Sequence, residues 1–323
     1  MRTTLKCAAA ALPLTLILAA CGGTSGGGSD DGAEGTQKIT VATAPIGDYT
    51  AVRLGVEKGF FEEEGLEVEF VPGRVGTETI TGVLSGSTDF AGVAVPPLLV
   101  SQSRNLDVAI VAPASVAPGD TGESTSALLA LDPGITTSGD LEGKTIAVNA
   151  LKAQAELEVR LFLDSEDVDS DSVTFVEVPF GEMPAALERG DVDAITGVEP
   201  FLSAAIADGA TVIGEVDRAL PAGSPITAYF TSDTLAESDP ELVEKFSAAI
   251  TKSLGYAAEH PDEVRATITE FTEVPAEVTA EIALPTFSST LQKEGVEQVK
   301  LDMEKYGFLS ADFEVDDLFW SAP

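Results

Sequence analysis

Apolar and polar positions follow the same order twice along this chain. Short β-branched runs occupy residues 38–44 (KITVATA) and 144–150 (KTIAVNA), and such runs suit buried strands. Matching segments then follow in both parts, at 66–73 (LEVEFVPG) and 173–181 (VTFVEVPFG), and at 86–96 (GSTDFAGVAVP) and 190–200 (GDVDAITGVEP). The chain therefore carries two copies of one pattern of predicted strands.

Helical spacing fills the gaps between these strands. Tyr49, Val52 and Val56 recur at intervals of three and four residues. Leu157 and Leu161 do the same in the second copy. Each copy predicts the order strand, helix, strand, helix, strand, and strands joined by crossover helices pair in parallel.

We therefore predict an α/β fold with two lobes, each a doubly wound, mostly parallel sheet flanked by helices. Open sheets of this kind bind ligands beyond the carboxyl ends of their strands, so two copies predict a ligand cleft between the lobes. A chance match, or an old duplication without a function, is the alternative explanation of the repeat.

The chain changes character after the second copy. Asp239 is a predicted N-cap with Pro240 at the first helical position, and helices are expected to continue to about Leu309. We expect this tail to pack on the first lobe. The predicted first lobe is therefore discontinuous, with residues 38–115 and 229–323, and the second lobe spans residues 116–228.

The N-terminus predicts export and anchoring. Arg2 and Lys6 precede an apolar run that is shorter than the ~20 residues of a membrane span, which is the layout of a secretory signal at residues 1–20. LAAC followed by glycine resembles a bacterial lipobox, which implies that Cys21 carries the lipid anchor. A plain signal peptide is the alternative. Residues 21–37 have the composition of a flexible tether.

Charge excludes two classes of partner. The 323 residues carry a formal net charge of −36. Such a surface repels nucleic acid and anionic lipid head groups. It argues only weakly against an anionic ligand, because charges beyond a Debye length of ~8 Å are largely screened.

Catalytic chemistry has little support in the sequence. His260 is the only histidine, so neither a Ser-His-Asp triad nor a site with several histidine ligands is expected. Asp89 and Asp193 occupy matching places at strand starts, where a turn or capping role is expected. We predict no catalytic residue, no metal site and no cofactor.

Candidate ligand contacts follow the predicted strands, at the ends that should face the cleft. In the first lobe they are Pro45, Gly47, Asp48, Tyr49, Arg74, Gly76, Thr77, Val95 and Pro96, and in the second Asn149, Lys152, Phe180, Met183, Glu199 and Phe201.

Arg74 and Glu199 point to different ligands. Arg74 next to a helix N-terminus can bind an anion, although it can equally pair with Glu78 on the surface. Glu199 at the cleft end of an apolar strand needs a hydrogen-bond donor from the protein or from a ligand. Phe180 and Phe201 can stack on a planar solute or belong to the core.

Three motifs, two in the first copy and one in the second, carry a resemblance to a known family. GFFEEEGLEVE (59–69) with VLSGSTDFAGV (83–93), and FVEVPFGEMPAALERGDVDAITGVEPF (175–201), are similar to the solute-binding proteins of ABC importers in the nitrate, sulfonate and taurine group. That group also contains binders of the thiamine pyrimidine precursor. The resemblance covers roughly residues 38 to 270. The cysteine-rich stretch of the related pyrimidine-synthesising enzymes is absent from this sequence.

The resemblance implies a protein that captures a small molecule between its lobes and delivers it to a permease and ATPase of an importer. With the signal sequence, it implies a bacterial, extracytoplasmic, lipid-anchored protein, which we expect to be a monomer. The sequence slightly favours a nitrate-, sulfonate- or taurine-type anion, and a pyrimidine precursor or similar heteroaromatic is the alternative. An enzyme or a sensor on the same scaffold is the alternative class.

Overall fold

The computed structural model describes residues 36–73, 77–272, 274–290 and 292–322. Several predicted features lie outside these residues: the signal at 1–20, Cys21, nearly all of the tether, Arg74 and Gly76. Within the described residues, no helix is long and apolar enough to span a membrane.

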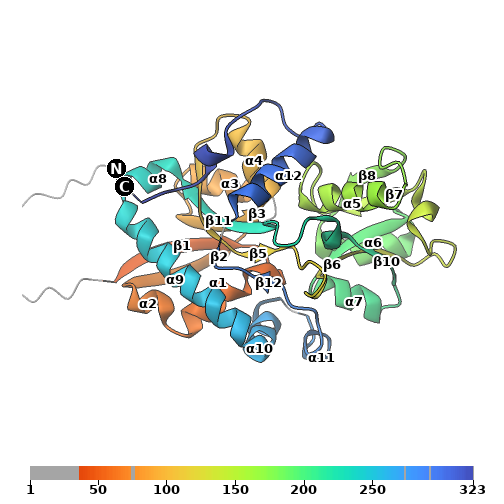
Figure 1. Ribbon diagram of the computed structural model, residues 1–323. Coiled ribbons are helices and arrows are strands. Elements are labelled where there is room, and N and C mark those ends of the chain that lie inside the picture. Colours follow the sequence, from red (N-terminus) through yellow and green to blue (C-terminus); the bar gives the residue numbers. More distant parts are fainter. Residues whose placement is uncertain (1–35, 74–76, 273, 291, 323) are drawn as a thin grey trace, which may run out of the picture. The chain divides into compact units, whose positions relative to one another are not determined.

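The described strands form two five-stranded sheets and one short pair. The first sheet has the order β2-β1-β3-β11-β4, and the second has the order β10-β6-β9-β7-β8 (Figure 1). The strands are β1 (Gln37–Thr43), β2 (Leu66–Pro72), β3 (Phe90–Ala94), β4 (Val108–Pro113), β5 (Ser115–Val116), β6 (Ser126–Ala130), β7 (Thr145–Val148), β8 (Thr174–Glu177), β9 (Ala194–Val198), β10 (Thr211–Glu215), β11 (Thr227–Ser232) and β12 (Thr286–Phe287).

Helices connect the strands and cover both sheets. The α-helices are α1 (Thr50–Glu57), α2 (Phe60–Glu63), α3 (Thr77–Leu84), α4 (Val95–Gln102), α5 (Gln154–Ser165), α6 (Met183–Arg189), α7 (Phe201–Ala207), α8 (Asp233–Ser238), α9 (Pro240–Glu259), α10 (Pro261–Thr272), α11 (Ala276–Thr279) and α12 (Lys293–Lys305). The 3-10 helices are η1 (Gly47–Tyr49), η2 (Ser138–Leu141), η3 (Phe180–Glu182), η4 (Val216–Ala219) and η5 (Val315–Leu318).

The repeat in the sequence corresponds to the same arrangement of strands in both sheets, and the predicted α/β fold is confirmed. β1 lies between β2 and β3 and pairs with both in parallel, as β7 does with β8 and β9. Each sheet also contains a strand that runs antiparallel to its neighbours, β11 in the first and β6 in the second. The sheets are therefore mixed. The antiparallel strand is in each case the one that enters from the other sheet.

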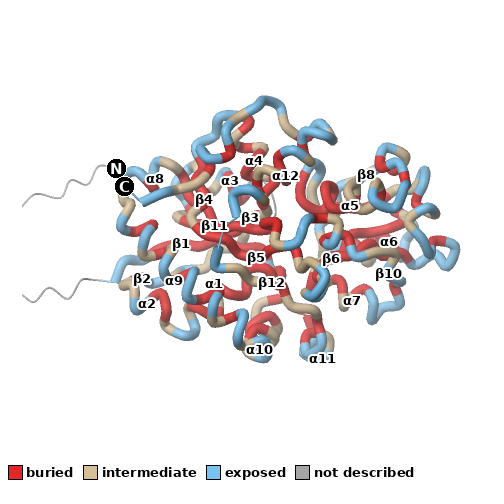
Figure 2. The backbone as a smooth tube through the Cα atoms, viewed as in Figure 1, coloured by how far each residue is buried: buried red, intermediate tan, exposed pale blue. Residues whose placement is uncertain are grey.

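Apolar side chains fill the space between sheet and helices on each face. On the first sheet, one core cluster includes residues of α1, α9 and α10, and another includes residues of α3, α4 and α12. The second sheet packs against α6 and α7 on one face and α5 on the other. Figure 2 shows the consequence: the central strands are buried, while the outer surfaces of the helices are exposed.

The aspartates of the repeat tie neighbouring strands together. Asp89 Oδ2 accepts hydrogen bonds from the backbone N–H and the hydroxyl of Thr40, at 2.7 and 2.8 Å. Asp193 Oδ2 accepts one from the backbone N–H of Thr145 at 2.8 Å, and its Oδ1 lies 3.3 Å from Lys144 Nζ. Both carboxylates therefore have a structural role at a strand start, as expected.

Two local predictions had different outcomes. The N-cap at Asp239 is confirmed, because its Oδ1 accepts a hydrogen bond from Leu242 N at 3.1 Å. Val95 and Pro96 were expected to end the third strand, but that strand ends at Ala94 and the two residues begin α4. Proline fits the first turn of a helix, where its missing N–H needs no acceptor.

The chain passes between the sheets along two segments that lie side by side. The first runs from β4 through β5 to β6, and the second from β10 to β11. Ala117 N donates to Ser224 O at 2.8 Å, and Ile226 N donates to Ser115 O at 3.0 Å. β12, from the C-terminal part of the chain, pairs with β5 in the first crossing. These hydrogen bonds hold the crossings as one short ribbon.

Candidate functional site

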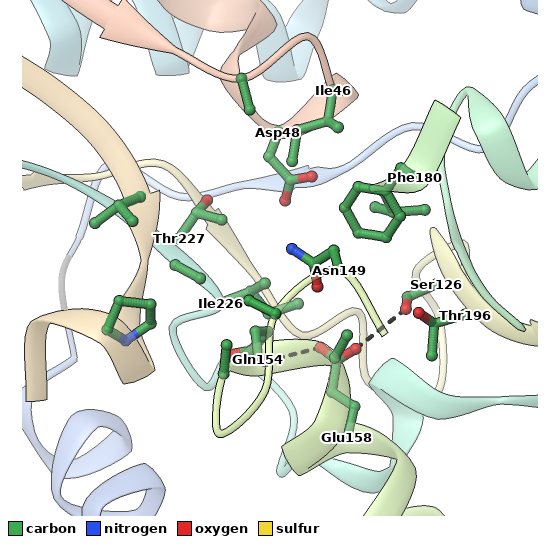
Figure 3. A pocket seen from close by; sticks show the side chains of 18 of the residues that line it. Ile46, Asp48, Ser126, Asn149, Gln154, Glu158, Phe180, Thr196, Ile226 and Thr227 are labelled. Atoms are coloured by element: carbon green, nitrogen blue, oxygen red, sulfur yellow. Dashed lines mark hydrogen bonds between the residues drawn. The ribbon is translucent and has the colours of Figure 1, made fainter. Parts of the chain in front are cut away.

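A cavity of about 70 Å³ lies where strand ends of both sheets meet. A single water needs only ~10–15 Å³, so the cavity has room for a small solute. Figure 3 shows polar side chains converging on it from η1, β6, the loop after β7, α5 and β11. The residues that line it are Ala44, Ile46, Asp48, Tyr49, Gly92, Val93, Ala94, Pro97, Thr125, Ser126, Asn149, Ala150, Ala153, Gln154, Ala155, Glu158, Phe180, Thr196, Val198, Ile226 and Thr227.

Asp48 is the acidic group on the first-sheet side. It lies in η1, directly after β1, and is 4% exposed. Its Oδ1 accepts a short hydrogen bond from the hydroxyl of Ser115, which also contacts the hydroxyl of Thr227 at 2.7 Å. Ser115 and Thr227 belong to β5 and β11, so Asp48 connects the cavity to both crossings. Burial raises the pKa of Asp48, and the hydrogen bond from Ser115 opposes this shift.

Glu158 is the acidic group on the second-sheet side. It lies on α5 and is 2% exposed. Its Oε1 accepts a hydrogen bond from Gln154 Nε2 at 2.8 Å, and its Oε2 accepts one from Ser126 Oγ at 3.1 Å. Burial, followed by the charge of Asp217, raises the pKa of Glu158 to about 8, although the hydrogen bonds from Gln154 and Ser126 oppose this shift. Uncharged donors thus hold a carboxyl that is hard to ionise.

Gln154 has an unsatisfied group beside this carboxyl. Its side-chain N–H donates to Glu158, while its carbonyl Oε1 is buried and has no hydrogen-bond partner within the described part of the chain. Buried polar atoms without partners are costly and uncommon. Because Gln154 lines the cavity, a ligand donor is one candidate for the missing partner.

Aromatic and aliphatic side chains complete the wall. Phe180 lies stacked on Phe201, with ring centroids 6.2 Å apart and planes inclined by 13°. Tyr49 packs so closely over Gly92 that a Cβ there would lie 2.6 Å from the tyrosine ring. The glycine of the first repeated strand is thus required by the position of this ring. Tyr49 and Phe180 give the cavity two aromatic walls.

The structure brings some of the predicted site residues together at the cavity. Asp48, Tyr49, Asn149 and Phe180 line it. The other described candidates do not, Arg74 and Gly76 lie outside the described residues, and the binding roles of all of them stay predictions. Val95, Pro96 and Met183 are buried in helices, and Phe201 stacks on Phe180. Pro45 is exposed, and Thr77 begins α3. Gly47 donates its N–H to Glu199 O at 3.1 Å, and Lys152 Nζ donates to Gly307 O at 3.4 Å.

Glu199 already has protein partners. Its side chain is buried and accepts hydrogen bonds from the hydroxyl and the backbone N–H of Ser203, at 2.8 and 3.2 Å. Burial raises the pKa of Glu199, and these hydrogen bonds oppose the shift. The sequence left open whether Glu199 binds a ligand or a group of the protein, and the described hydrogen bonds come from the protein residue Ser203.

Sequence reasoning missed several polar residues of the cavity. Ser126 and Thr227 lie in the strands that enter from the other sheet, and Gln154 and Glu158 lie on α5. A signal was available for the last two. They are four residues apart, so they share a helix face, and α5 begins directly after the loop that carries the predicted contact Asn149.

The charges on the cavity wall restrict the chemistry of a ligand. Among the described lining residues there are two carboxyl groups, Asp48 and Glu158, and none is lysine, arginine or histidine. The described part of the chain also has no group of three or more His, Cys, Asp or Glu side chains that could hold a metal ion. This wall favours a neutral or cationic molecule with N–H or O–H donors over an anion.

Comparisons with known proteins agree with the predicted family. The family model described as NMT1/THI5 like matches residues 47–264. The formylaminopyrimidine-binding protein of Halalkalibacterium halodurans is 24% identical over 253 residues, which cover 77% of this chain and 73% of that protein. The 4-amino-5-hydroxymethyl-2-methylpyrimidine phosphate synthase of Aspergillus parasiticus is 24% identical over 243 residues, 70% of this chain and 68% of the synthase.

A solved structure has the same fold. The alkanesulfonate-binding protein SsuA from Xanthomonas axonopodis pv. citri, bound to MOPS, superposes with a TM-score of 0.76 at 17% identity. The match covers 89% of this chain and 99% of that protein. The resemblance stated from the sequence is therefore confirmed at the level of family and fold.

Proposed function

The chain belongs to the NMT1/THI5-like family, and from this premise we propose that it is the extracytoplasmic solute-binding protein of an ABC importer. It captures a small molecule in the cavity between the two sheets and delivers it to a permease and ATPase. The relatives named as binding proteins support this proposal. The signal and Cys21 support anchoring in a bacterial membrane by lipid.

One observation carries the choice of ligand: two buried carboxyl groups and no basic side chain among the described residues of the cavity wall. Burying an anion beside the carboxyl group of Asp48 is unfavourable, whereas N–H or O–H groups of a solute can donate to it. Glu158, whose carboxyl is hard to ionise, supplies no positive charge that would offset that of an anion. The sequence slightly favoured an anion, and the described wall favours the alternative. We therefore place an aminopyrimidine or a similar heteroaromatic ahead of nitrate, sulfonates and taurine.

The remaining wall suits a flat ring with polar edges. Tyr49 and Phe180 can pack against the faces of such a ring, since aromatic pairs favour stacked or edge-to-face contacts. Asp48 and Asn149 line the same cavity and can bind donors and acceptors on the edge of the ring. Ile46, Val198 and Ile226 exclude water around it.

Calorimetry with 4-aminopyrimidine, taurine and nitrate tests the ligand class. We expect 4-aminopyrimidine to bind. Asp48→Asn should weaken it ~10-fold or more, because a hydrogen bond to a charged group contributes ~1.5–3 kcal/mol. Asp262→Asn changes a fully exposed side chain and is the matched control, so this variant should bind 4-aminopyrimidine as the unmodified protein does. Binding of taurine or nitrate without binding of 4-aminopyrimidine would contradict the proposal.

The proposal assigns binding without chemical turnover, although one relative is named as a synthase. The single histidine supports this, because His260 stacks on Tyr256, with centroids 3.7 Å apart, and does not line the cavity. Ligand recovered after long incubation with the protein should be unchanged by mass spectrometry. A product whose amount grows with time would instead support an enzyme.

A further inference from the structure

Two buried glutamates on one helix differ in what surrounds them. Glu156 and Glu158 are 4% and 2% exposed. Glu156 pairs with Arg160 at 2.9 Å and accepts a hydrogen bond from Lys152 N at 2.7 Å. Glu158 receives its hydrogen bonds from Gln154 and Ser126, both uncharged. Of the two, only Glu158 lines the cavity.

Among the residues that the structure describes, no lysine or arginine pairs with Glu158. On η4, Asp217 raises the pKa of Glu158, and Arg218 on the same element pairs with Glu215. The carboxyl group of Asp48, on η1, also raises the pKa of Glu158. The other described cations near this helix have different partners. Arg160 pairs with Glu156 and Asp171, Lys305 pairs with Asp164, and Lys152 Nζ donates to Gly307 O at 3.4 Å.

A carboxyl buried in this way keeps its proton, because an unpaired buried charge costs several kcal/mol. Ser126 and Gln154 already donate to its two oxygens. The O–H of the protonated group is therefore a donor that needs an acceptor. The carbonyl of Gln154 is at the same time an acceptor that lacks a donor.

We propose that Glu158 and Gln154 together select the ligand, by binding a ring nitrogen and the amino group next to it. The Glu158 O–H donates to the ring nitrogen, with its proton lying between the two atoms. The amino group donates to Gln154 Oε1. The preferred edge is thus N=C–NH2 in an uncharged base, an assignment that rests on the proposed function and makes its ligand class specific.

This assignment gives ligand binding a definite dependence on pH. Below the pKa of Glu158, about 8, the carboxyl holds the proton that the ring nitrogen needs. Above that pKa the empty protein loses the proton, and a neutral base then meets a carboxylate that can only accept. Affinity should therefore fall as pH rises, by up to about tenfold per pH unit. A ligand bound as a cation to an ionised Glu158 requires the opposite sign.

The test is calorimetry with 4-aminopyrimidine between pH 6.5 and 9.5, a range in which this weak base is uncharged. The unmodified protein should bind well at pH 6.5 to 7.5 and progressively less tightly above pH 8. Pyrimidine, which lacks the amino group, should bind ~10-fold or more weakly, because Gln154 then stays without a donor. A flat profile, or affinity that rises with pH, overturns the inference.

Substitutions at position 158 separate the proton from the shape of the side chain. Glu158→Gln supplies an amide N–H where the carboxyl has its O–H, and this N–H does not titrate, so the affinity of the variant should no longer fall above pH 8. Glu158→Leu should weaken binding at every pH by ~10-fold or more. Glu166→Gln, at an exposed position at the end of the same helix, is the matched control.

The outcomes distinguish this inference from the function on which it rests. If 4-aminopyrimidine binds but Glu158→Gln keeps the pH profile of the unmodified protein, the proposed function stands and the role of Glu158 is wrong. If 4-aminopyrimidine binds at no pH while taurine or nitrate binds, the proposed ligand class fails and the inference fails with it. If a variant does not fold, the dependence of affinity on pH in the unmodified protein still tests the inference.

Discussion

At the scale of single residues, the partner of a buried group decides its role more than its burial does. Glu156, Glu158 and Glu199 are all nearly inaccessible. Glu156 has an arginine, and Glu199 has the hydroxyl and N–H of Ser203. Glu158 has uncharged donors and an open cavity beside it. Residue type alone would not separate these three carboxyls.

The raised pKa of Glu158 should be visible in the stability of the ligand-free protein. Its value is about 8 in the folded protein against 4.5 for an unperturbed glutamate. Between these values the folded state binds a proton that the unfolded state has lost, so this contribution is present below pH ~4.5 and is lost as pH rises through ~8. Glu158→Gln removes the dependence. Stability relative to this variant should therefore decrease from pH 5 to pH 8.5.

Chemical denaturation at several pH values measures this difference. Comparing the unmodified protein with Glu158→Gln cancels the titration of most other groups, and Glu166→Gln should show no such trend against the unmodified protein. A difference that stays constant with pH would mean that Glu158 is already ionised when the cavity is empty.

At the scale of elements, the hydrogen bonds of Asp89 and Asp193 explain why an aspartate occupies the same place in both copies of the pattern. Asp89 and Asp193 each connect the start of the third strand in a copy to the backbone of the first, at Thr40 and Thr145. This link fixes how the two strands align. Because side chains alternate along a strand, a slip of one residue would turn every buried side chain to the other face.

Replacing either aspartate by alanine should lower stability and leave ligand affinity unchanged. Both aspartates lie at strand starts, away from the cavity. Either replacement leaves a backbone N–H without its acceptor, which should lower the free energy of unfolding by ~1–3 kcal/mol. Asp89→Ala should have the larger effect, since Asp89 also accepts from the Thr40 hydroxyl. Thermal unfolding should show losses of a few degrees, at ~2–4 °C per kcal/mol. Weaker ligand binding without a loss of stability would contradict this role.

The strands and their parallel pairing could be predicted because each depends on a short stretch of sequence. The antiparallel strands β6 and β11 could not, since their direction depends on the crossings between the sheets. The same limit applies to the site. Asp48 was found from its place after β1, but its partner Ser115 lies 67 residues away. Glu158 was missed because a glutamate in a predicted helix is ordinarily on a solvated face.

At the scale of the whole molecule, the prediction that remains from the sequence is the anchor at Cys21. Cys21→Ser should prevent lipid attachment, so the protein should be released from the membrane or keep its signal sequence. Metabolic labelling with a fatty acid and fractionation of cells measure both effects. A Cys21→Ser protein that stays membrane-bound and labelled would show that the lipobox interpretation is wrong.

The strand order of the first sheet also constrains the sequence of events as the chain is made. In that sheet β4 stands at the edge, next to β11, and β11 comes after every strand of the second sheet. A growing chain therefore exposes β3 and β4 without their shared neighbour until residue 232 has emerged, while residues 126–215 can already complete the second sheet. Unpaired apolar strands invite wrong partners. The half of the protein that is synthesised first is thus the half that finishes last, and it is where a chaperone would have most to protect.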